Sequence, residues 1–156
     1  MKIAVDYLNA IQGGVVIVSD GKILSKLEES YYTFLTPTGF GSVFLAIFSV
    51  VRPGDEILTA DPVYNPTRML TQDYLTDYGI KTTFYNPHDL KSISQNITKK
   101  TKAVVVTHLF GHPAYIKDIQ KICNEQCIEL IEDCAQSVDS FYENIETGNF
   151  GNTSFY

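Results

Sequence analysis

The sequence predicts an α/β fold in which helices cover both faces of a mostly parallel sheet. Two short apolar runs, residues 102–107 and 127–131, are too short for helices and too apolar for strands with one wet face. Between them lie a turn with Gly and Pro and then four apolar residues at helical spacing, Ile116, Ile119, Ile122 and Cys123. A strand, a crossover helix and a second parallel strand are the unit from which such sheets are built.

The same alternation extends toward the N-terminus. Asn65 is expected to cap a helix that begins at Pro66 and buries Leu70, Tyr74 and Tyr78 before Gly79 ends it. The other predicted elements are strands over residues 31–35, 56–59 and 80–85 and helices over residues 40–51 and 89–97.

The first thirty residues give weaker patterns. Residues 1–12 fit a short amphipathic helix and residues 15–18 an extended segment. A turn at residues 19–21 could lead into a helix that ends near Glu29. We therefore divide the chain into an N-terminal segment, residues 1–35, and an α/β domain, residues 36–156.

Composition excludes several classes of function. The chain has 156 residues, of which 44% are apolar, and a net charge of −6, which argues against a nucleic-acid partner because phosphate binding needs clustered Lys and Arg. It contains no apolar run long enough to span a membrane and no signal-type N-terminus, so we expect a cytoplasmic protein. Cys123, Cys127 and Cys134 are expected to be reduced core thiols rather than metal ligands, because no second pair of ligands accompanies them.

Two features mark a candidate ligand site. The run ending at Ile131 delivers Glu132 and Asp133 at a strand's carboxyl end, where open α/β sheets usually bind ligands. The turn at residues 36–39 precedes a helix whose first N–H groups can hold a phosphate without a basic side chain. An ordinary strand–turn–helix junction remains the alternative, and Phe44 in place of a third glycine argues against a dinucleotide site.

Three segments carry a resemblance to a known family. Residues 101–114, 131–136 and 148–151 resemble the DegT/DnrJ/EryC1/StrS sugar aminotransferases, which are pyridoxal-phosphate enzymes of fold type I, the aspartate-aminotransferase fold. Residues 39–87, above all residues 61–68, are more similar to the cystathionine lyases and synthases of the same fold type. Together these similarities extend from about Gly13 onward.

The resemblance implies roles for five residues. Asp133 would pair with the pyridinium nitrogen of pyridoxal 5'-phosphate, and Gln136 would bond the ring oxygen. Tyr64 would stack on the ring, while Gly39 and Phe40 would form the phosphate-binding turn. His108 and His112 fit the family pattern and are expected to be structural or to support the site, and no metal is implied.

Two departures from the family pattern affect the expected activity. About eight residues are missing before the phosphate-binding turn, and the Schiff-base lysine is expected beyond residue 156, which leaves no catalytic residue among residues 1–156. We expect a partial large domain of an aminotransferase that moves an amino group from an amino acid donor to a keto (nucleotide-)sugar, inactive alone and homodimeric at full length. The alternatives are a sulfur amino acid lyase or transferase of the same fold, and a non-catalytic remnant or interaction protein.

Overall fold

The computed structural model describes residues 2–3, 25–26 and 30–156 and places six strands in one sheet. The strand order is β1-β8-β5-β4-β2-β3, and every neighbouring pair is parallel, which confirms the predicted architecture. The strands are β1 Lys2–Ile3, β2 Glu56–Ala60, β3 Lys81–Tyr85, β4 Thr101–Thr107, β5 Glu129–Asp133 and β8 Thr153–Phe155. Two further strands, β6 Phe141–Tyr142 and β7 Ile145–Glu146, form a separate antiparallel hairpin.

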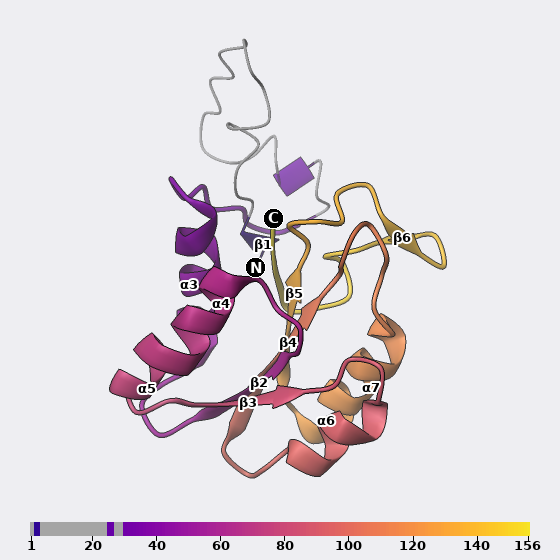
Figure 1. Cartoon of the computed structure of the whole chain (residues 1–156). Helices are drawn as coiled ribbons and strands as arrows, with labels where there is room; N and C mark the ends of the chain where they lie inside the picture. Colours follow the sequence, from indigo (N-terminus) through magenta and orange to yellow (C-terminus); the bar gives the residue numbers. More distant parts are fainter. Residues whose placement is uncertain (1, 4–24, 27–29) are drawn as a thin grey trace.

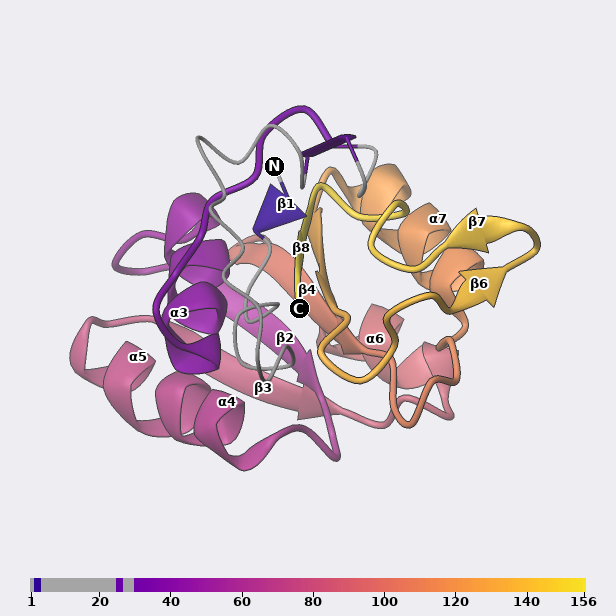
Figure 2. The same ribbon diagram turned by 90° about the horizontal axis from the view of Figure 1, so that it is seen from above.

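Helices cover both faces of the sheet (Figures 1 and 2). One face carries α3 Gly39–Val50 and a continuous helical segment made of α4 Asn65–Met69, η1 Leu70–Tyr74 and α5 Leu75–Asp77. The other face carries α6 Leu90–Asn96 and α7 Ile116–Gln126. No helix in these described ranges has the length and apolar character to cross a membrane.

Strand β4 shows why its sequence is apolar at nearly every position. Ala103 and Val105 join the core beneath α3, whereas Val104 and Val106 join the core beneath α6 and α7. Successive side chains of a strand point to opposite faces, so a strand covered on both sides needs apolar residues throughout. Each fully buried aliphatic side chain of this kind stabilises the fold by roughly 1.5–3 kcal/mol.

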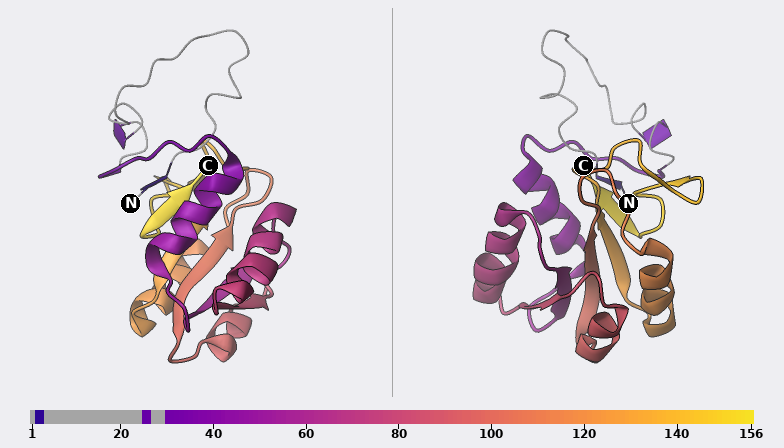
Figure 3. Two further views of the ribbon diagram at one scale, coloured as in Figure 1. Left: turned by 90° about the vertical axis from the view of Figure 1, so that its left-hand side faces the viewer. Right: turned by 45° about the vertical axis from the view of Figure 1, so that its right-hand side comes forward.

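Helix α3 lies over β5 and β8 with its N-terminus at the carboxyl edge of the strands (Figure 3). Val43, Ala46 and Ile47 are buried against the sheet. On its outer side Phe44 stacks on Phe48 with ring centroids 4.2 Å apart, and 38% of Phe44 is exposed. The sequence of α3 is apolar at almost every position, but only its inner face is buried.

The predicted buried stripe of the next helix was wrong in two of its three positions. Leu70 and Leu75 are buried, but more than half of Tyr74 and Tyr78 is exposed. The cause is the π-helical turn η1, which adds a residue to one turn and moves the inward face along by one position. The helix also begins at Asn65 rather than after it, and Tyr64 is the capping residue.

The predicted strand over residues 31–35 does not form. Tyr31 is 94% exposed, Tyr32 69% and Phe34 47%, so these aromatic side chains lie on the surface instead of in a core. Strand propensity reflects packing against neighbours, and within the described residues no strand of the six-stranded sheet pairs with this run, in which Thr33 makes an isolated bridge.

Three further expectations need correction. Cys127 is exposed because it ends α7 in a left-handed conformation with φ 55°, and β5 begins two residues later than predicted. Lys2–Ile3 is a strand, parallel to β8, where an N-terminal helix was expected. The remainder of that helix, the extended segment at 15–18 and most of residues 19–29 lie outside the described residues. The division of the chain at residue 35 stays a prediction.

Candidate functional site

All five candidate ligand-binding residues follow strands or begin a helix at one edge of the sheet. Parallel strands bring their carboxyl ends to the same edge, so Asp133 at the end of β5 and Tyr64 after β2 lie along it. The turn at residues 53–54 leads from α3 directly into β2, so α3 runs opposite to the strands and starts at that edge. Gly39 and Asp133 therefore occupy the same edge, as predicted.

Asp133 is the buried acid of this edge. It is 3% exposed, and its Oδ1 accepts a hydrogen bond from the backbone N–H of Ala135 at 3.2 Å. Burial raises the pKa of Asp133 to about 6, although the Ala135 N–H and the nearby His108 act in the opposite direction. Its register partners are Thr107 on β4 and Phe155 on β8, and Phe155 belongs to the core beneath α3. The carboxylate therefore faces the α3 side of the sheet.

The N-terminus of α3 offers backbone donors at the same edge. Thr38 caps the helix, and its hydroxyl accepts a hydrogen bond from Gly41 N–H at 3.0 Å. Gly39 and Phe40, the first two helical residues, have N–H groups without an acceptor inside the helix, where the helix dipole adds partial positive charge. An alanine Cβ at Gly39 would meet no atom within 4 Å, so this turn leaves room for a ligand.

Tyr64 and Gln136 flank this edge. Tyr64 is 58% exposed, which leaves a ring face open for stacking. Gln136 is exposed, and its Oε1 accepts from Phe110 N–H at 3.2 Å, while its carbonyl accepts from Gly111 N–H at 2.7 Å. Gln136 thus holds the turn after β4, and its amide nitrogen is the part suited to donate to a ligand oxygen.

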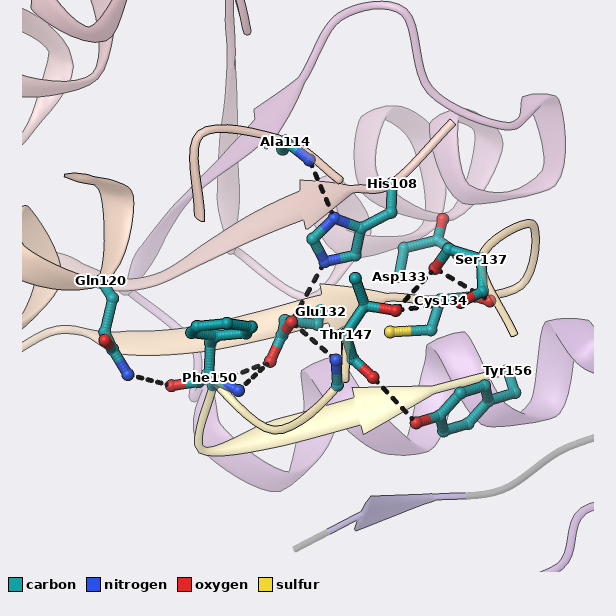
Figure 4. Close-up of polar contacts among 12 residues, drawn as sticks. His108, Ala114, Gln120, Glu132, Asp133, Cys134, Ser137, Thr147, Phe150 and Tyr156 are labelled. Carbon is teal, nitrogen blue, oxygen red and sulfur yellow. Dashed lines mark hydrogen bonds and ion pairs between the residues drawn. The ribbon is translucent and has the colours of Figure 1, made fainter. Parts of the chain in front are cut away.

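Glu132, the neighbour of Asp133, points to the opposite face and forms a buried polar network (Figure 4). Its Oε2 accepts from His108 Nε2 at 3.0 Å and from Gly148 N–H at 2.8 Å. Its Oε1 accepts from the N–H groups of Phe150, at 2.8 Å, and Gly151. Four donors thus satisfy this carboxylate, so burying it tethers residues 148–151 to β5.

The hydrogen bonds of His108 fix its tautomer. Its Nδ1 accepts from Ala114 N–H at 3.0 Å, so the ring proton lies on Nε2, which donates to Glu132. The ring is 0% exposed and uses both nitrogens, which makes it a structural residue as expected. His112 is exposed and closes a turn through its backbone N–H, which donates to Leu109 O at 2.9 Å.

His108, Glu132 and Cys134 bring their ligand-type atoms within 4.8 Å of one another. The carboxylate of Glu132 already accepts from four donors. Burial also raises the pKa of the Cys134 thiol well above its ordinary value, and metal binding requires the thiolate. The cluster is a hydrogen-bonded part of the core, which agrees with the expectation of a reduced core thiol.

Sequence reasoning missed the network of Glu132. It singled out Glu132 and Asp133 together and the segment 148–151 separately, but it assigned a role only to Asp133. The available signal was the alternation of a strand, which turns two adjacent carboxylates to opposite faces. One of the two therefore had to be satisfied on the α7 side of the sheet, where residues 148–151 lie.

The described residues fit two parts of pyridoxal phosphate. A buried carboxylate suits a protonated ring nitrogen, and the N–H groups that have no acceptor within the helix at the start of twelve-residue α3 suit a phosphate. Asp133 also has beside it a buried hydroxyl, Thr107 Oγ1, that has no hydrogen-bond partner among the described residues. A region with an incompletely satisfied acid and hydroxyl is typical of a site built to receive a polar ligand.

Comparisons with known proteins agree with this geometry. The chain is 26% identical to GDP-perosamine synthase of Escherichia coli O157:H7 over 97% of its own length and 44% of that protein. An aminotransferase from Psychrobacter cryohalolentis superposes with a TM-score of 0.72 at 22% identity, covering 85% of this chain and 35% of the other.

A third similar protein is named for an activity of sulfur metabolism. A protein from Campylobacter jejuni assigned as an O-acetylhomoserine (thiol)-lyase, whose structure carries a pyridoxyl-lysine phosphate group, is 26% identical with a TM-score of 0.59. The match covers 62% of this chain and 25% of that protein. The chain thus spans less than half the length of each of these proteins.

The family model for the DegT/DnrJ/EryC1/StrS aminotransferases matches residues 44–156. This range begins inside α3 and includes every strand from β2 to β8, and with them Tyr64, Asp133 and Gln136. The chain belongs to the DegT/DnrJ/EryC1/StrS aminotransferase family.

Proposed function

We propose that the chain serves a pyridoxal-phosphate-dependent aminotransferase that moves an amino group from an amino acid donor to a keto sugar carried by a nucleotide. The observation that carries this proposal is the position of Asp133, buried at the carboxyl end of β5 on the face and edge where α3 begins. Bound pyridoxal phosphate supplies an electron sink for the carbon that bears the amino group. The sugar class rests on family membership and on the similarity to GDP-perosamine synthase.

Asp133 would hold the proton on the ring nitrogen. The pKa of this carboxyl is about 6, so most of it is ionised at neutral pH and an adjacent cation lowers its pKa further. The ion pair would be nearly free of water because Asp133 is 3% exposed. A partner cation would therefore offset the cost of burying this charge, which gives Asp133 a reason to bind the protonated form of the ring.

The other candidate residues would orient the ring. The N–H groups of Gly39 and Phe40 would bind the phosphate, and the exposed ring of Tyr64 would stack on the pyridine. Gln136 would donate from its amide nitrogen to the ring oxygen, since its Oε1 is already used by Phe110. Each group uses only atoms that the folded chain leaves available at the carboxyl edge.

We further propose that residues 1–156 bind pyridoxal phosphate reversibly and have no aminotransferase activity by themselves. The resemblance places the Schiff-base lysine beyond residue 156, and an amine in that position is needed to move the proton during transamination. A homodimeric, cytoplasmic full-length enzyme belongs to the same proposal. It is supported by family membership alone.

The sulfur amino acid alternative has its own support. The similarity to the Campylobacter jejuni protein covers 62% of the chain, and residues 61–68 resemble that branch of the fold. Release of homocysteine from cystathionine, or replacement of the acetate of O-acetylhomoserine by sulfide, with no exchange of amino groups, would favour this alternative. Amino transfer to a keto nucleotide-sugar without thiol chemistry would favour the aminotransferase.

A binding experiment on the chain tests the proposed function. Pyridoxal phosphate is titrated into the wild type and Asp133→Asn, with Asp118→Asn on the exposed start of α7 as the control. We expect binding that weakens at least tenfold in Asp133→Asn and is unchanged in the control, because the amide carries no charge to pair with the ring. Equal affinities in all three proteins would contradict the role of Asp133, and no binding at all would favour the non-catalytic alternative.

Chemical labelling tests the absence of a Schiff-base lysine. The bound sample is reduced with borohydride, digested and mapped by mass spectrometry. We expect scattered, substoichiometric modification of lysines. Stoichiometric labelling of one lysine, together with turnover of an amino donor, would show that residues 1–156 already contain the nucleophile.

A further inference from the structure

Four buried side-chain hydroxyls in the described part of the chain lack a hydrogen-bond partner. They belong to Thr59, Thr67, Thr107 and Ser154. A buried polar group without a partner destabilises a fold, so each needs a reason to remain. Thr107 is the one that ends its strand at the carboxyl edge of the sheet, where the candidate site lies.

Thr107 is the lateral neighbour of Asp133. The two residues are register partners in the parallel pair β4–β5, and both are the last residues of their strands. Register partners in this pair share a face, as Val105 and Ile131 do in the core beneath α3. Thr107 lies two residues beyond Val105, so its side chain is on the α3 face, as is that of Asp133.

The spacing of strands sets how these side chains can interact. Neighbouring strands lie about 4.8 Å apart, so a hydroxyl and a carboxylate on one face can meet after a small rotation of either side chain. In the described structure they do not bond, since Thr107 Oγ1 has no partner and Asp133 Oδ1 accepts from Ala135. Thr107 is only 8% exposed, so water does not readily take the place of that bond.

We propose that Thr107 is a positioning residue whose hydroxyl donates to the Asp133 carboxylate when the ring of pyridoxal phosphate covers it. The inference rests on the proposed function and deepens it. A bound ring excludes the remaining water from Asp133, and the carboxylate then needs a second donor besides the Ala135 N–H. The unpartnered hydroxyl at its side would supply that donor and limit the rotation of the carboxylate.

A structural role of Thr107 and a role in binding predict different results for the same substitution. If Thr107 were only structural, replacing its hydroxyl by a methyl group would change neither ligand affinity nor its pH dependence. If the hydroxyl serves the bound state, the same change removes an unpaired polar group from the core of the free protein, which stabilises it. It also weakens ligand binding.

The test compares Thr107→Val with the matched control Thr59→Val. Thr59 lies on β2 on the same face, is equally unpartnered and is 0% exposed, but it is one residue short of the strand end. Both variants should keep or raise the urea midpoint of unfolding. Only Thr107→Val should weaken pyridoxal phosphate, by about tenfold, as expected for loss of a hydrogen bond to a charged group.

Two more readouts exclude a merely structural effect. As the pH is lowered, the affinity for pyridoxal phosphate should begin to fall at the same pH in both proteins, but in Thr107→Val the fall should level off at a higher pH, because the lost donor favours the ionised carboxylate only in the bound state. An analogue with carbon in place of the ring nitrogen presents no cation, so Asp133 should take up a proton when it is covered and no longer need the Thr107 hydroxyl; this analogue should bind the wild type and Thr107→Val equally. Thr107→Ser should retain the affinity of the wild type, whereas Thr107→Ala should not.

The outcomes separate this inference from the proposed function. If the wild type binds pyridoxal phosphate and Thr107→Val binds it with equal affinity, the proposed role of Thr107 is wrong and the proposed function is unaffected. A tenfold loss that persists with the nitrogen-free analogue also overturns it, because the hydroxyl would then act elsewhere than on the pair. Absence of wild-type binding overturns both. If Thr107→Val fails to fold, the Ser and Ala variants give the same comparison.

Discussion

Glu132 and Asp133 are adjacent carboxylates at the end of one strand, yet their surroundings differ completely. Glu132 faces α7, is 0% exposed and accepts four hydrogen bonds from His108, Gly148, Phe150 and Gly151. Asp133 faces α3, is 3% exposed and accepts one bond from Ala135, beside an unpartnered threonine hydroxyl. The alternation of the strand thus places Glu132 in the core on the α7 side and Asp133 on the α3 side, at the edge of the candidate site.

The two carboxylates contribute differently to folding stability and to ligand binding. A buried charge with a full set of donors stabilises the segment that it ties down, whereas a buried charge with few donors costs stability until a partner arrives. Glu132 therefore belongs to the structural side of β5, and Asp133 to the side that we propose binds pyridoxal phosphate. Replacing each carboxylate by a neutral group of similar shape should change the free energy of unfolding in opposite directions.

The largest effect is expected for Glu132→Ala. The change leaves four buried donors without an acceptor and releases residues 148–151, so it should lower the free energy of unfolding by about 3–5 kcal/mol. Urea denaturation followed by circular dichroism measures it, and Glu132→Gln should lie between this variant and the wild type. A change below about 1 kcal/mol would show that the network is not needed for folding.

Asp133→Asn should have the opposite sign. The folded pKa of Asp133 is about 6 against an ordinary value of 3.8, so the folded state holds the proton more tightly. Stability from this group is therefore present below about pH 4 and lost as pH rises to about 6. At pH 7 the variant should be more stable than the wild type by up to about 3 kcal/mol, since a unit of pKa corresponds to about 1.4 kcal/mol.

The measurement is the difference in unfolding free energy between Asp133→Asn and wild type from pH 3.5 to 7.5. The difference should grow across that window and level off above about pH 7. Taking the difference cancels the other titrating groups that the two proteins share. A curve parallel to that of the wild type would mean that Asp133 is not strained by burial.

Gly151→Ala tests the packing of residues 148–151 against β5. A Cβ at Gly151 would lie 2.6 Å from Leu130 O and 3.2 Å from Glu132 Oε1, so β5 and the loop must separate. We expect a loss of about 1–3 kcal/mol in thermal or urea unfolding, as for other overpacked sites. Gly39→Ala is the matched control on the ligand side, where no atom lies within 4 Å, and its stability should be unchanged.

The smallest effect is expected for Gln136→Ala. It removes one exposed hydrogen bond, from Phe110 N–H to Gln136 Oε1, and should cost less than about 1 kcal/mol of stability. Its affinity for pyridoxal phosphate should nevertheless fall if the amide binds the ring oxygen. Unchanged affinity in a fluorescence titration would limit Gln136 to holding the turn after β4.

The fold class could be predicted because the signals are local. Short apolar runs separated by Gly- and Pro-containing turns determine that β4 and β5 are buried parallel strands, and helical spacing determines α7. The position of Asp133 follows from the same pattern, since it ends one of these strands. Gly39 could be placed on the same edge because a helix that passes through a short turn into a strand runs opposite to that strand.

Errors arose where neighbours decide the outcome. The aromatic run at residues 31–35 has the composition of a strand, but no strand of the sheet pairs with it. The π-helical turn at residues 70–74 moves the buried face of the helix by one residue, and no local sequence pattern indicates this turn.

The sequence alone was enough to give the order of strands and helices from α3 to β5, the edge that carries Asp133 and the resemblance to the aminotransferase fold. Only the tertiary structure decided which of two adjacent carboxylates is satisfied. It brought Gly148, Phe150 and Gly151 back against β5 to satisfy Glu132, and it left Asp133 beside the unpartnered hydroxyl of Thr107. These contacts join segments distant in the chain, and hydrogen-bond partners across such distances depend on the packing of the whole sheet rather than on local sequence.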